Sequence, residues 1–315
     1  MIILSYMDLL KKPVRVAKYL WKRVTLWPYY FWITRDAVWQ KNNRTLLESY
    51  QKHGAQFTEL QKKILNGLET EGIYITHIDE LIPGTNFLHE MQALSETLIN
   101  PEGKGKKKEF LNYFYEEKNA KDLNAPFLRF ALSEPVLETV SAYLKMFARL
   151  RFFSTNITRP VDAGSDAAGS QRWHRDPGIK RICKVFFYVN DVLDISAGPF
   201  VYVKGSQPGG KYGHLFKQIL FGMEGYYPPE GAVERAVDSA DITPCTGRAG
   251  TIIFCNTTGL HKGGYSTAKE RIMFTAFYKH SLTNIPPAKK YPENFEANFA
   301  RLGKLGKLAI ESKGF

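Results

Sequence analysis

Two short segments of this chain carry the residue types that bind a metal ion. The segment QRWHRDP contains His174 and Asp176, and the segment GLHKGG contains His261. Two imidazoles and one carboxylate form a facial triad that holds a ferrous ion and leaves positions open for other ligands. Residues i and i+2 of a strand point to the same side, so His174 and Asp176 can share one metal. These three side chains are therefore the predicted ligands.

An arginine follows His261, the histidine that is distant in sequence from the His-x-Asp pair, and lies at the start of the next strand-like run. Arg271 comes ten residues after His261 and begins the strand-like run RIMFTAFY. A guanidinium on that strand can pair in bidentate fashion with a carboxylate that chelates the metal. A lone His-x-Asp pair is also common in surface turns, so the surrounding sequence decides whether the pair is interpreted as a metal site. Strand-like runs surround these ligands at 183–189, 198–203, 250–256 and 271–278.

This arrangement resembles the phytanoyl-CoA dioxygenase family of iron(II)/2-oxoglutarate-dependent oxygenases, over roughly residues 60 to 280. The segments that carry the resemblance are WHRDP, KVFFYVNDV, GPFVYVKGS, GTIIF, GLHKGG and ERIMFTAFY. The resemblance implies Fe(II) at His174, Asp176 and His261, with 2-oxoglutarate anchored by Arg271 and O2 as the second co-substrate. Related halogenases lack the carboxylate ligand, so the presence of Asp176 favours hydroxylation.

The resemblance also implies further site residues. Asn156, on the strand before the His-x-Asp pair, matches a position that reaches 2-oxoglutarate in relatives. Phe186 matches a pocket-lining aromatic residue, and strand alternation places Lys184 and Tyr188 on its face. Some relatives have serine or alanine two residues past the arginine, where this chain has Met273.

The expected architecture is an all-β core with flanking helices, in the α+β class. The resemblance implies a double-stranded β-helix, which is a cupin-like jelly roll. We expect a basic, aromatic and helical extension at 1–59, the dioxygenase domain at 60–285 and a C-terminal tail at 286–315. Outside the core, helical patterns occur at 38–68, 87–99 and 135–146, and a short strand-like pattern occurs at 71–75.

Composition restricts the class of protein. Three cysteines without a CxxC motif predict a reducing, cytoplasmic location and no disulfide framework. The sequence shows no secretory signal and no run long enough to span a bilayer. The basic run at 104–108 is interpreted as a solvated loop, because nucleic-acid binding requires more than a run of charge. The expected partner is a small-molecule substrate.

The net charge of +12 is concentrated in part at the N-terminal end. Residues 9–35 interleave lysine and arginine with aromatic residues that include Trp21, Trp27 and Trp32. Such a segment can make a peripheral contact with an anionic membrane. The competing interpretation packs these aromatics on the core, and it is favoured because surface helices of globular proteins have the same apolar stripe.

The sequence therefore predicts a dioxygenase that hydroxylates an unactivated C–H bond of a small-molecule or lipid-like metabolite. One alternative is a catalytically silent jelly-roll protein that serves as a membrane-surface or scaffold module. Such a module would not need all four of His174, Asp176, His261 and Arg271, so their presence argues against it. Another alternative is a metal-binding cupin isomerase, and Arg271 after the distal histidine disfavours it.

Overall fold

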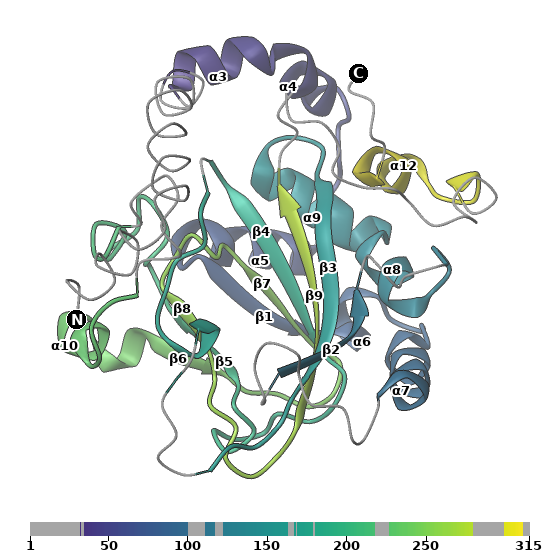
Figure 1. Cartoon of the computed structure of the whole chain (residues 1–315). Coiled ribbons are helices and arrows are strands. Elements are labelled where there is room, and N and C mark those ends of the chain that lie inside the picture. Colours follow the sequence, from purple (N-terminus) through teal and green to yellow (C-terminus); the bar gives the residue numbers. More distant parts are fainter. Residues whose placement is uncertain are drawn as a thin grey trace, which may run out of the picture.

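Two antiparallel sheets form the centre of the molecule. The computed structural model describes residues 32, 35–99, 111–116, 122–162, 167, 169–178, 180–217, 227–279 and 299–310. The six strands of the larger sheet are, in spatial order, β1 (Ile73–His77), β7 (Thr251–Cys255), β4 (Ile182–Tyr188), β9 (Arg271–Lys279), β3 (Arg149–Thr158) and β2 (Leu111–Glu116) (Figure 1). The three strands of the smaller sheet are β6 (Ile242–Cys245), β5 (Phe200–Val203) and β8 (His261–Gly263).

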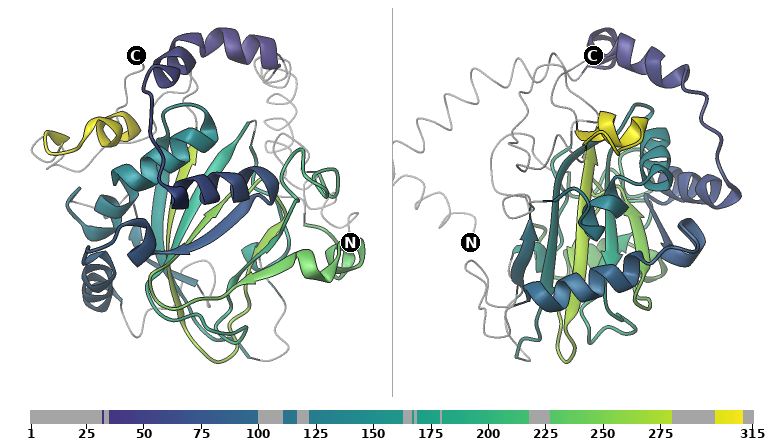
Figure 2. Two further views of the ribbon diagram at one scale, coloured as in Figure 1. Left: turned by 180° about the vertical axis from the view of Figure 1, so that it is seen from behind. Right: turned by 90° about the vertical axis from the view of Figure 1, so that its right-hand side faces the viewer.

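Helices cover one face of the larger sheet, as the view from behind in Figure 2 shows. They are α5 (Glu59–Thr70), α6 (Ile78–Leu81), α7 (Phe87–Leu98), α8 (Pro126–Ala131), α9 (Glu134–Leu144) and α12 (Lys304–Ile310). Helix α9 contacts β4, α5 contacts β7, and α12 contacts β3. The opposite face of the sheet is thereby left to the smaller sheet.

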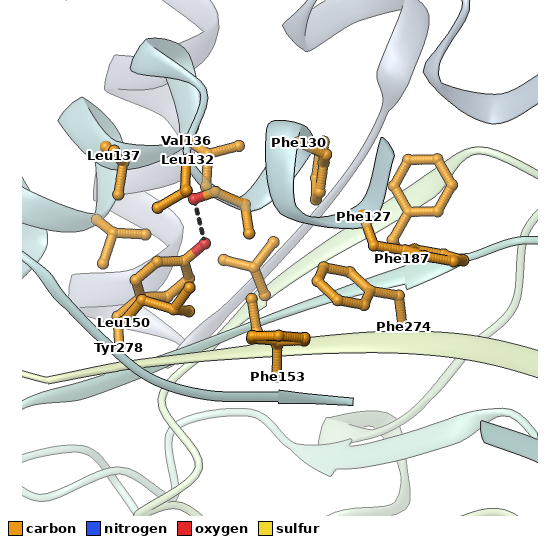
Figure 3. Close-up of a cluster of buried hydrophobic side chains, with 14 of the residues drawn as sticks. Phe127, Phe130, Leu132, Val136, Leu137, Leu150, Phe153, Phe187, Phe274 and Tyr278 are labelled. Carbon is orange, nitrogen blue, oxygen red and sulfur yellow. Dashed lines mark hydrogen bonds between the residues drawn. The ribbon is translucent and has the colours of Figure 1, made fainter. Parts of the chain in front are cut away.

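Strand alternation assigns each side chain of the larger sheet to one of two cores. Phe187 of β4 and Phe274 of β9 point toward the helices and meet Phe127 and Phe130 of α8 (Figure 3). The ring centroids of Phe127 and Phe274 are 5.2 Å apart, and those of Phe130 and Phe187 are 5.0 Å apart. Each fully buried phenylalanine contributes about 1.5–3 kcal/mol through removal of its surface from water.

The second core lies between the two sheets. Phe186 of β4 packs on Phe200 of β5 with ring centroids 4.6 Å apart. The hydroxyl of Tyr188 donates to Cys245 O at 2.8 Å and accepts from Phe200 N at 3.0 Å. Because one phenol bonds to both β5 and β6, the smaller sheet is held in place over β4.

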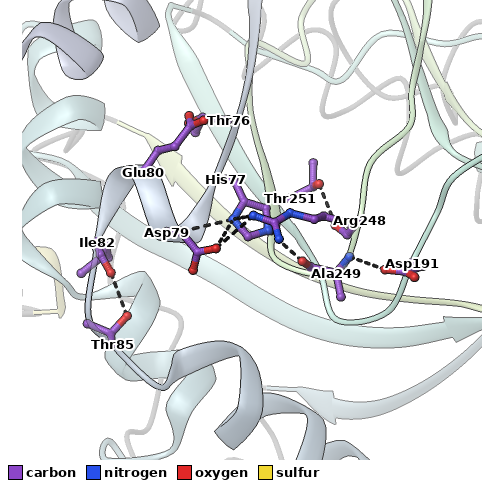
Figure 4. A network of polar contacts seen from close by, with 10 residues as sticks. All are labelled: Thr76, His77, Asp79, Glu80, Ile82, Thr85, Asp191, Arg248, Ala249 and Thr251. Carbon is purple, nitrogen blue, oxygen red and sulfur yellow. Dashed lines mark hydrogen bonds and ion pairs between the residues drawn. The ribbon is translucent and has the colours of Figure 1, made fainter.

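A polar cluster joins the end of β1 to the turn before β7 (Figure 4). His77 Nε2 lies 2.8 Å from Ala249 O, and Arg248 Nη2 lies 3.0 Å from Asp79 Oδ2. The amide of Ala249 donates to Asp191 Oδ1 at 2.7 Å, which brings in the turn after β4. Three segments distant in sequence are thus fixed at one end of the sheet.

The region predicted to be helical over 38–68 is helical in separate pieces. The chain forms α3 (Asp36–Asn42), α4 (Arg44–Gln51) and α5, with a non-helical stretch before α5. Gly54 has φ of 62°, a left-handed conformation that interrupts a helix. Thr58 then caps α5 in a capping box with Gln61, which satisfies amides at the new N-terminus.

The two ends of the chain differ in what the structure describes. Within 9–35 only Trp32 and Arg35 are described, so the membrane-contact hypothesis falls outside the described residues. Trp32 is 59% exposed. In the segment expected to be a tail, Leu305 and Leu308 of α12 belong to the main core. None of the described helices has the length and apolarity needed to cross a bilayer. The division at 59 and 285 stays a prediction.

Candidate metal centre

The His-x-Asp segment lies beside β8 in the smaller sheet. The backbone amide of His174 donates to His261 O at 3.0 Å, and the amide of His261 donates to His174 O at 3.0 Å. The amide of Asp176 donates to Thr257 O at 2.8 Å. The segment makes one isolated bridge and no regular strand, which corrects the expectation of a strand. Pro177 follows directly and has no N–H to extend the ladder.

The three predicted ligands lie together. Their donor atoms all lie within 4.8 Å of one another. His174 Nδ1 is 2.8 Å from Arg172 O, and His261 Nδ1 is 3.0 Å from Gly259 O. A carbonyl acceptor at Nδ1 favours the tautomer whose lone pair is on Nε2, the nitrogen that then coordinates a metal. His261 Nε2 is 3.7 Å from Asp176 Oδ2.

The charge states suit metal coordination. Burial and the neighbouring His174 lower the pKa of His261 to about 3, so its imidazole is neutral at physiological pH. Burial by itself would raise the pKa of Asp176. The Lys184 ammonium and His261 outweigh that effect and hold the pKa of this carboxyl well below its usual range. The site therefore presents a neutral imidazole and a carboxylate, as a divalent ion requires.

The donor set fits a ferrous ion. Asp176 Oδ2 is buried and accepts no hydrogen bond of good geometry from the described residues. The ammonium of Lys184 is an ionic contact at 2.6 Å from this oxygen. Two imidazole nitrogens and one carboxylate oxygen are the ligands of the 2-His-1-carboxylate site of non-haem iron enzymes. His174, Asp176 and His261 would hold the ion here.

A hydrogen-bonded loop delivers His261 to the site. Asn256 donates to Tyr143 Oη at 2.7 Å and accepts from the amide of Thr258 at 3.1 Å. The loop then passes Tyr202 so closely that a Cβ on Gly259 would lie 2.0 Å from its hydroxyl oxygen. Only glycine fits at that approach, which explains the residue two positions before the ligand.

Arg271 is a buried cation near β8, where a Cβ built on Gly263 would lie 4.0 Å from its Nη2. Its Nη1 donates to Gly198 O, and its Nη2 donates to Thr158 Oγ1 at 3.0 Å. No carboxylate pairs with it among the described residues, and its Nε has no acceptor there. Burial of a guanidinium that is only 4% exposed, without a carboxylate partner, costs folding free energy. An anionic ligand would remove that cost.

The other predicted residues occupy different positions around the triad. Asn156 is 5% exposed, pairs with Met273 across β3 and β9, and has a buried Oδ1 without a described donor. Lys184 contacts Asp176, as given above. Phe186 lies between the sheets. The Tyr188 hydroxyl is bonded to the backbone at both β5 and β6, and the pocket-lining role of its ring stays a prediction.

Three further residues near the site were not predicted. Thr158 contacts Arg271 and lies two positions from Asn156, so strand alternation offered a signal for it. The Tyr227 ring centroid is 5.9 Å from that of His174. Arg175 donates to the carbonyls of Ser206, Thr258, Tyr212 and Leu215 at 2.5–3.1 Å. No sequence pattern marks Arg175, because all its acceptors are backbone atoms.

A cavity of about 990 Å³ lies elsewhere in the described structure, between α3 and α4 on one side and the end of α9 on the other. Trp39, Arg44 and Lys180 are among its lining residues, and no triad residue is among them. Lys180 is ion-paired with Asp36 and Arg44 with Glu48. The chemistry-bearing residues are therefore not in this cavity.

Comparison with known proteins identifies the fold. Neither a protein-family model nor a curated protein matches this sequence. The structure is similar to that of the epimerase SnoN in complex with Fe3+, alpha ketoglutarate and nogalamycin RO, at 14% identity over 74% of this chain and 93% of that chain, with a TM-score of 0.54. A second SnoN structure, described as a non-heme alpha ketoglutarate-dependent epimerase from nogalamycin biosynthesis, gives 15% identity over 74% and 92%, with a TM-score of 0.50. At this level of identity the likeness shows that the two proteins share a fold.

Proposed function

We propose that this protein is an Fe(II)- and 2-oxoglutarate-dependent dioxygenase. The observation that carries the proposal is the triad of His174, Asp176 and His261, combined with the buried guanidinium of Arg271, which pairs with no carboxylate in the described part of the chain. A cupin isomerase or a silent scaffold needs no such cation. The iron and 2-oxoglutarate named in the SnoN structure support the same pair of cofactors here.

The order of the strands supports a double-stranded β-helix as the finer description of the fold. After β3 the chain alternates between sheets: His174 lies beside the smaller sheet, β4 belongs to the larger sheet, and β5 and β6 belong to the smaller one. It then returns through β7, β8 and β9 to the larger, smaller and larger sheets. This winding supports the proposal of a jelly roll whose two sheets enclose the site.

Each residue has a defined task in the proposed reaction. Iron, 2-oxoglutarate and O2 together supply an oxidant that converts C–H to C–OH, with succinate and carbon dioxide as the co-products. His174, Asp176 and His261 hold the ion and leave a face open. Arg271 binds the distal carboxylate of 2-oxoglutarate, with Thr158 orienting the guanidinium. Asn156 donates to or accepts from the co-substrate on the same sheet face.

The proposed substrate is a small-molecule or lipid-like metabolite, and the proposed outcome is hydroxylation of an unactivated C–H bond. The fold is compatible with other outcomes of C–H activation, since SnoN is described as an epimerase. Product analysis separates them. Hydroxylation adds one oxygen atom from O2 to the product, whereas epimerisation leaves its mass unchanged.

Metal titration is the experiment that tests the proposal. Anaerobic titration of the wild-type protein with Fe(II) should give one ion per chain. His174→Ala should raise the Kd for Fe(II) at least tenfold, or about 1.4 kcal/mol. His89→Ala is a matched control, because His89 is exposed on α7 and outside the triad.

Turnover should then depend on the co-substrate. Wild-type protein with Fe(II) should form succinate from 2-oxoglutarate in air, and His174→Ala should not. Equal iron affinity in the wild type, His174→Ala and His89→Ala would contradict the metal site. Iron binding at the triad without binding of 2-oxoglutarate would contradict the dioxygenase and favour the isomerase.

A further inference from the structure

Lys184 contacts the carboxylate oxygen that faces the metal-binding histidine. Its Nζ is 2.6 Å from Asp176 Oδ2, and the same oxygen is 3.7 Å from His261 Nε2. The Lys184 side chain is 15% exposed, and its Nζ lies 5.7 Å from the ring centroids of both Phe152 and Phe277. A second acidic partner for Lys184 is absent from the described residues. The ammonium therefore contacts the same oxygen of Asp176 that lies closer than 4 Å to a metal-binding nitrogen of His261.

The charges around this oxygen set up a competition. The described site contains two cations, the largely buried Lys184 and the buried Arg271, and one carboxylate, Asp176. A divalent ion bound to Asp176 adds two positive charges beside an ammonium that a low-dielectric surrounding screens poorly. A dicarboxylate bound to that ion brings two negative charges back. The ammonium thus opposes the metal alone and favours the metal together with a dianion.

We propose that Lys184 couples metal binding to co-substrate binding. This inference rests on the proposed function. In the metal-free protein the ammonium neutralises Asp176, and the metal must take this carboxylate from it. Once the metal is bound, the positive charge of Lys184 attracts the 2-oxoglutarate dianion. Fe(II) then binds weakly alone and more tightly when 2-oxoglutarate is present, and the effect is reciprocal because the two ligands share one coupling free energy.

A simpler role for Lys184 predicts the opposite sign. A lysine that only orients Asp176 from outside the coordination sphere, without competing, would support the metal ligand, and its removal would weaken metal binding. A competing lysine weakens the metal, so its removal should strengthen metal binding. The direction of the change in iron affinity therefore separates a coupling residue from a supporting one.

Three substitutions make the comparison. Lys184→Met removes the charge and keeps an unbranched side chain that packs well against Phe152 and Phe277. Lys184→Arg keeps the charge. Lys269→Met is the matched control, because Lys269 Nζ lies 2.7 Å from Asp194 Oδ2 in an ion pair that contains no triad residue. If Lys184→Met does not fold, Lys184→Gln offers the same loss of charge with a polar side chain beside Asp176.

The measurement is anaerobic calorimetric titration with Fe(II), with and without saturating 2-oxoglutarate. We expect Lys184→Met to bind Fe(II) alone at least tenfold more tightly than the wild type does. The factor by which 2-oxoglutarate enhances iron affinity should shrink at least tenfold in the same variant. Lys184→Arg and Lys269→Met should retain the wild-type affinity and the wild-type enhancement.

The outcomes that contradict the coupling role differ from the outcome that contradicts the proposed function. Unchanged or weaker iron binding in Lys184→Met, with intact binding in the wild type, would overturn the coupling role and leave the proposed function standing. An unchanged enhancement by 2-oxoglutarate would do the same. If wild-type protein and His174→Ala bind iron equally, the proposed function fails, and the role of Lys184 fails with it.

Discussion

Among single residues of the candidate site, Arg271 stands out because no carboxylate in the described part of the chain pairs with it. Arg271 is buried near β8, and within the described part of the chain it donates to a carbonyl and a hydroxyl, neither of which carries charge. A buried guanidinium is ordinarily matched by a carboxylate. The expectation that a ligand supplies this carboxylate leads to a direct test.

We predict that Arg271→Ala raises the Kd for 2-oxoglutarate by tenfold or more, or about 1.4 kcal/mol. Arg271→Lys should restore part of the affinity, because an ammonium keeps the charge but cannot form a two-point contact. Titration of the iron-loaded protein with 2-oxoglutarate measures both values. Arg129→Ala is the control, since Arg129 is a half-exposed arginine paired with Glu90 on the helical side. Unaltered affinity in Arg271→Ala would assign this arginine to the scaffold.

At the scale of elements, one side chain connects the loops that carry the ligands. Arg175 stands between His174 and Asp176 and is 6% exposed. Its guanidinium donates to the carbonyls of Ser206 and Tyr212 after β5 and of Thr258 before β8. The segment that contributes two ligands is thereby held to the loop that contributes the third.

Loss of Arg175 should destabilise the protein and loosen the metal site together. We expect Arg175→Met to lower the free energy of unfolding by about 3 kcal/mol, because charged hydrogen bonds are lost and carbonyls stay buried. Urea unfolding measures this change, and iron titration of the folded variant should give a raised Kd. Arg235→Met, at an exposed position on α10 (Ala232–Ala236), should change neither. Loss of stability with unchanged iron affinity would show that the loops keep their geometry without Arg175.

The start of α5 gives a second prediction at this scale. Thr58 accepts a hydrogen bond from the Gln61 amide, and the Gln61 side chain accepts one from the Thr58 amide. Thr58→Ala removes half of this capping box and should cost about 1 kcal/mol of stability. Thermal unfolding of metal-free protein checks it, with Thr85→Ala, an exposed threonine between α6 and α7, as the control. Equal unfolding temperatures in all three proteins would contradict the capping role.

In the whole molecule, the larger core joins side chains from segments that are far apart in the sequence. Ile64 and Leu68 of α5 and Leu308 of α12 belong to the same cluster as Cys183 of β4. Cys183, Cys245 and Cys255 are fully buried free thiols. Burial raises the pKa of Cys183 to about 12 and also raises the pKa values of the other two thiols.

The three thiols should therefore be inert in the folded protein. At pH 8 they stay protonated and inaccessible, so a thiol reagent should label none of them before unfolding and all three in urea. Stability from these groups is present below their ordinary pKa of 9.0 and is lost as pH rises toward 12, because the unfolded thiols ionise first. Time-resolved labelling at pH 8 measures the first effect. Rapid labelling of native protein would show that the sheets open locally.

The sequence by itself determined the chemical content of the site. The types and spacing of His174, Asp176 and His261 predicted that these side chains lie together, because strand alternation and the demands of metal coordination are local rules. The main strands β4, β5, β7 and β9 were predicted from their apolar runs for the same reason. The helix break near Gly54 was missed, because apolar spacing on both sides of it continues at helical intervals.

Only the tertiary structure decided which contacts these residues make. Lys184 and Asp176 are neighbours because β4 returns beside the His-x-Asp segment, a crossing that spacing along the chain does not encode. Arg175 acquires its role from backbone carbonyls, which every residue has and no sequence pattern marks. The hydroxyl of Tyr188 bonds across to the smaller sheet, a contact that strand alternation does not encode. Strand alternation determines the face on which a side chain lies, whereas the packing of the two sheets determines which residue it contacts.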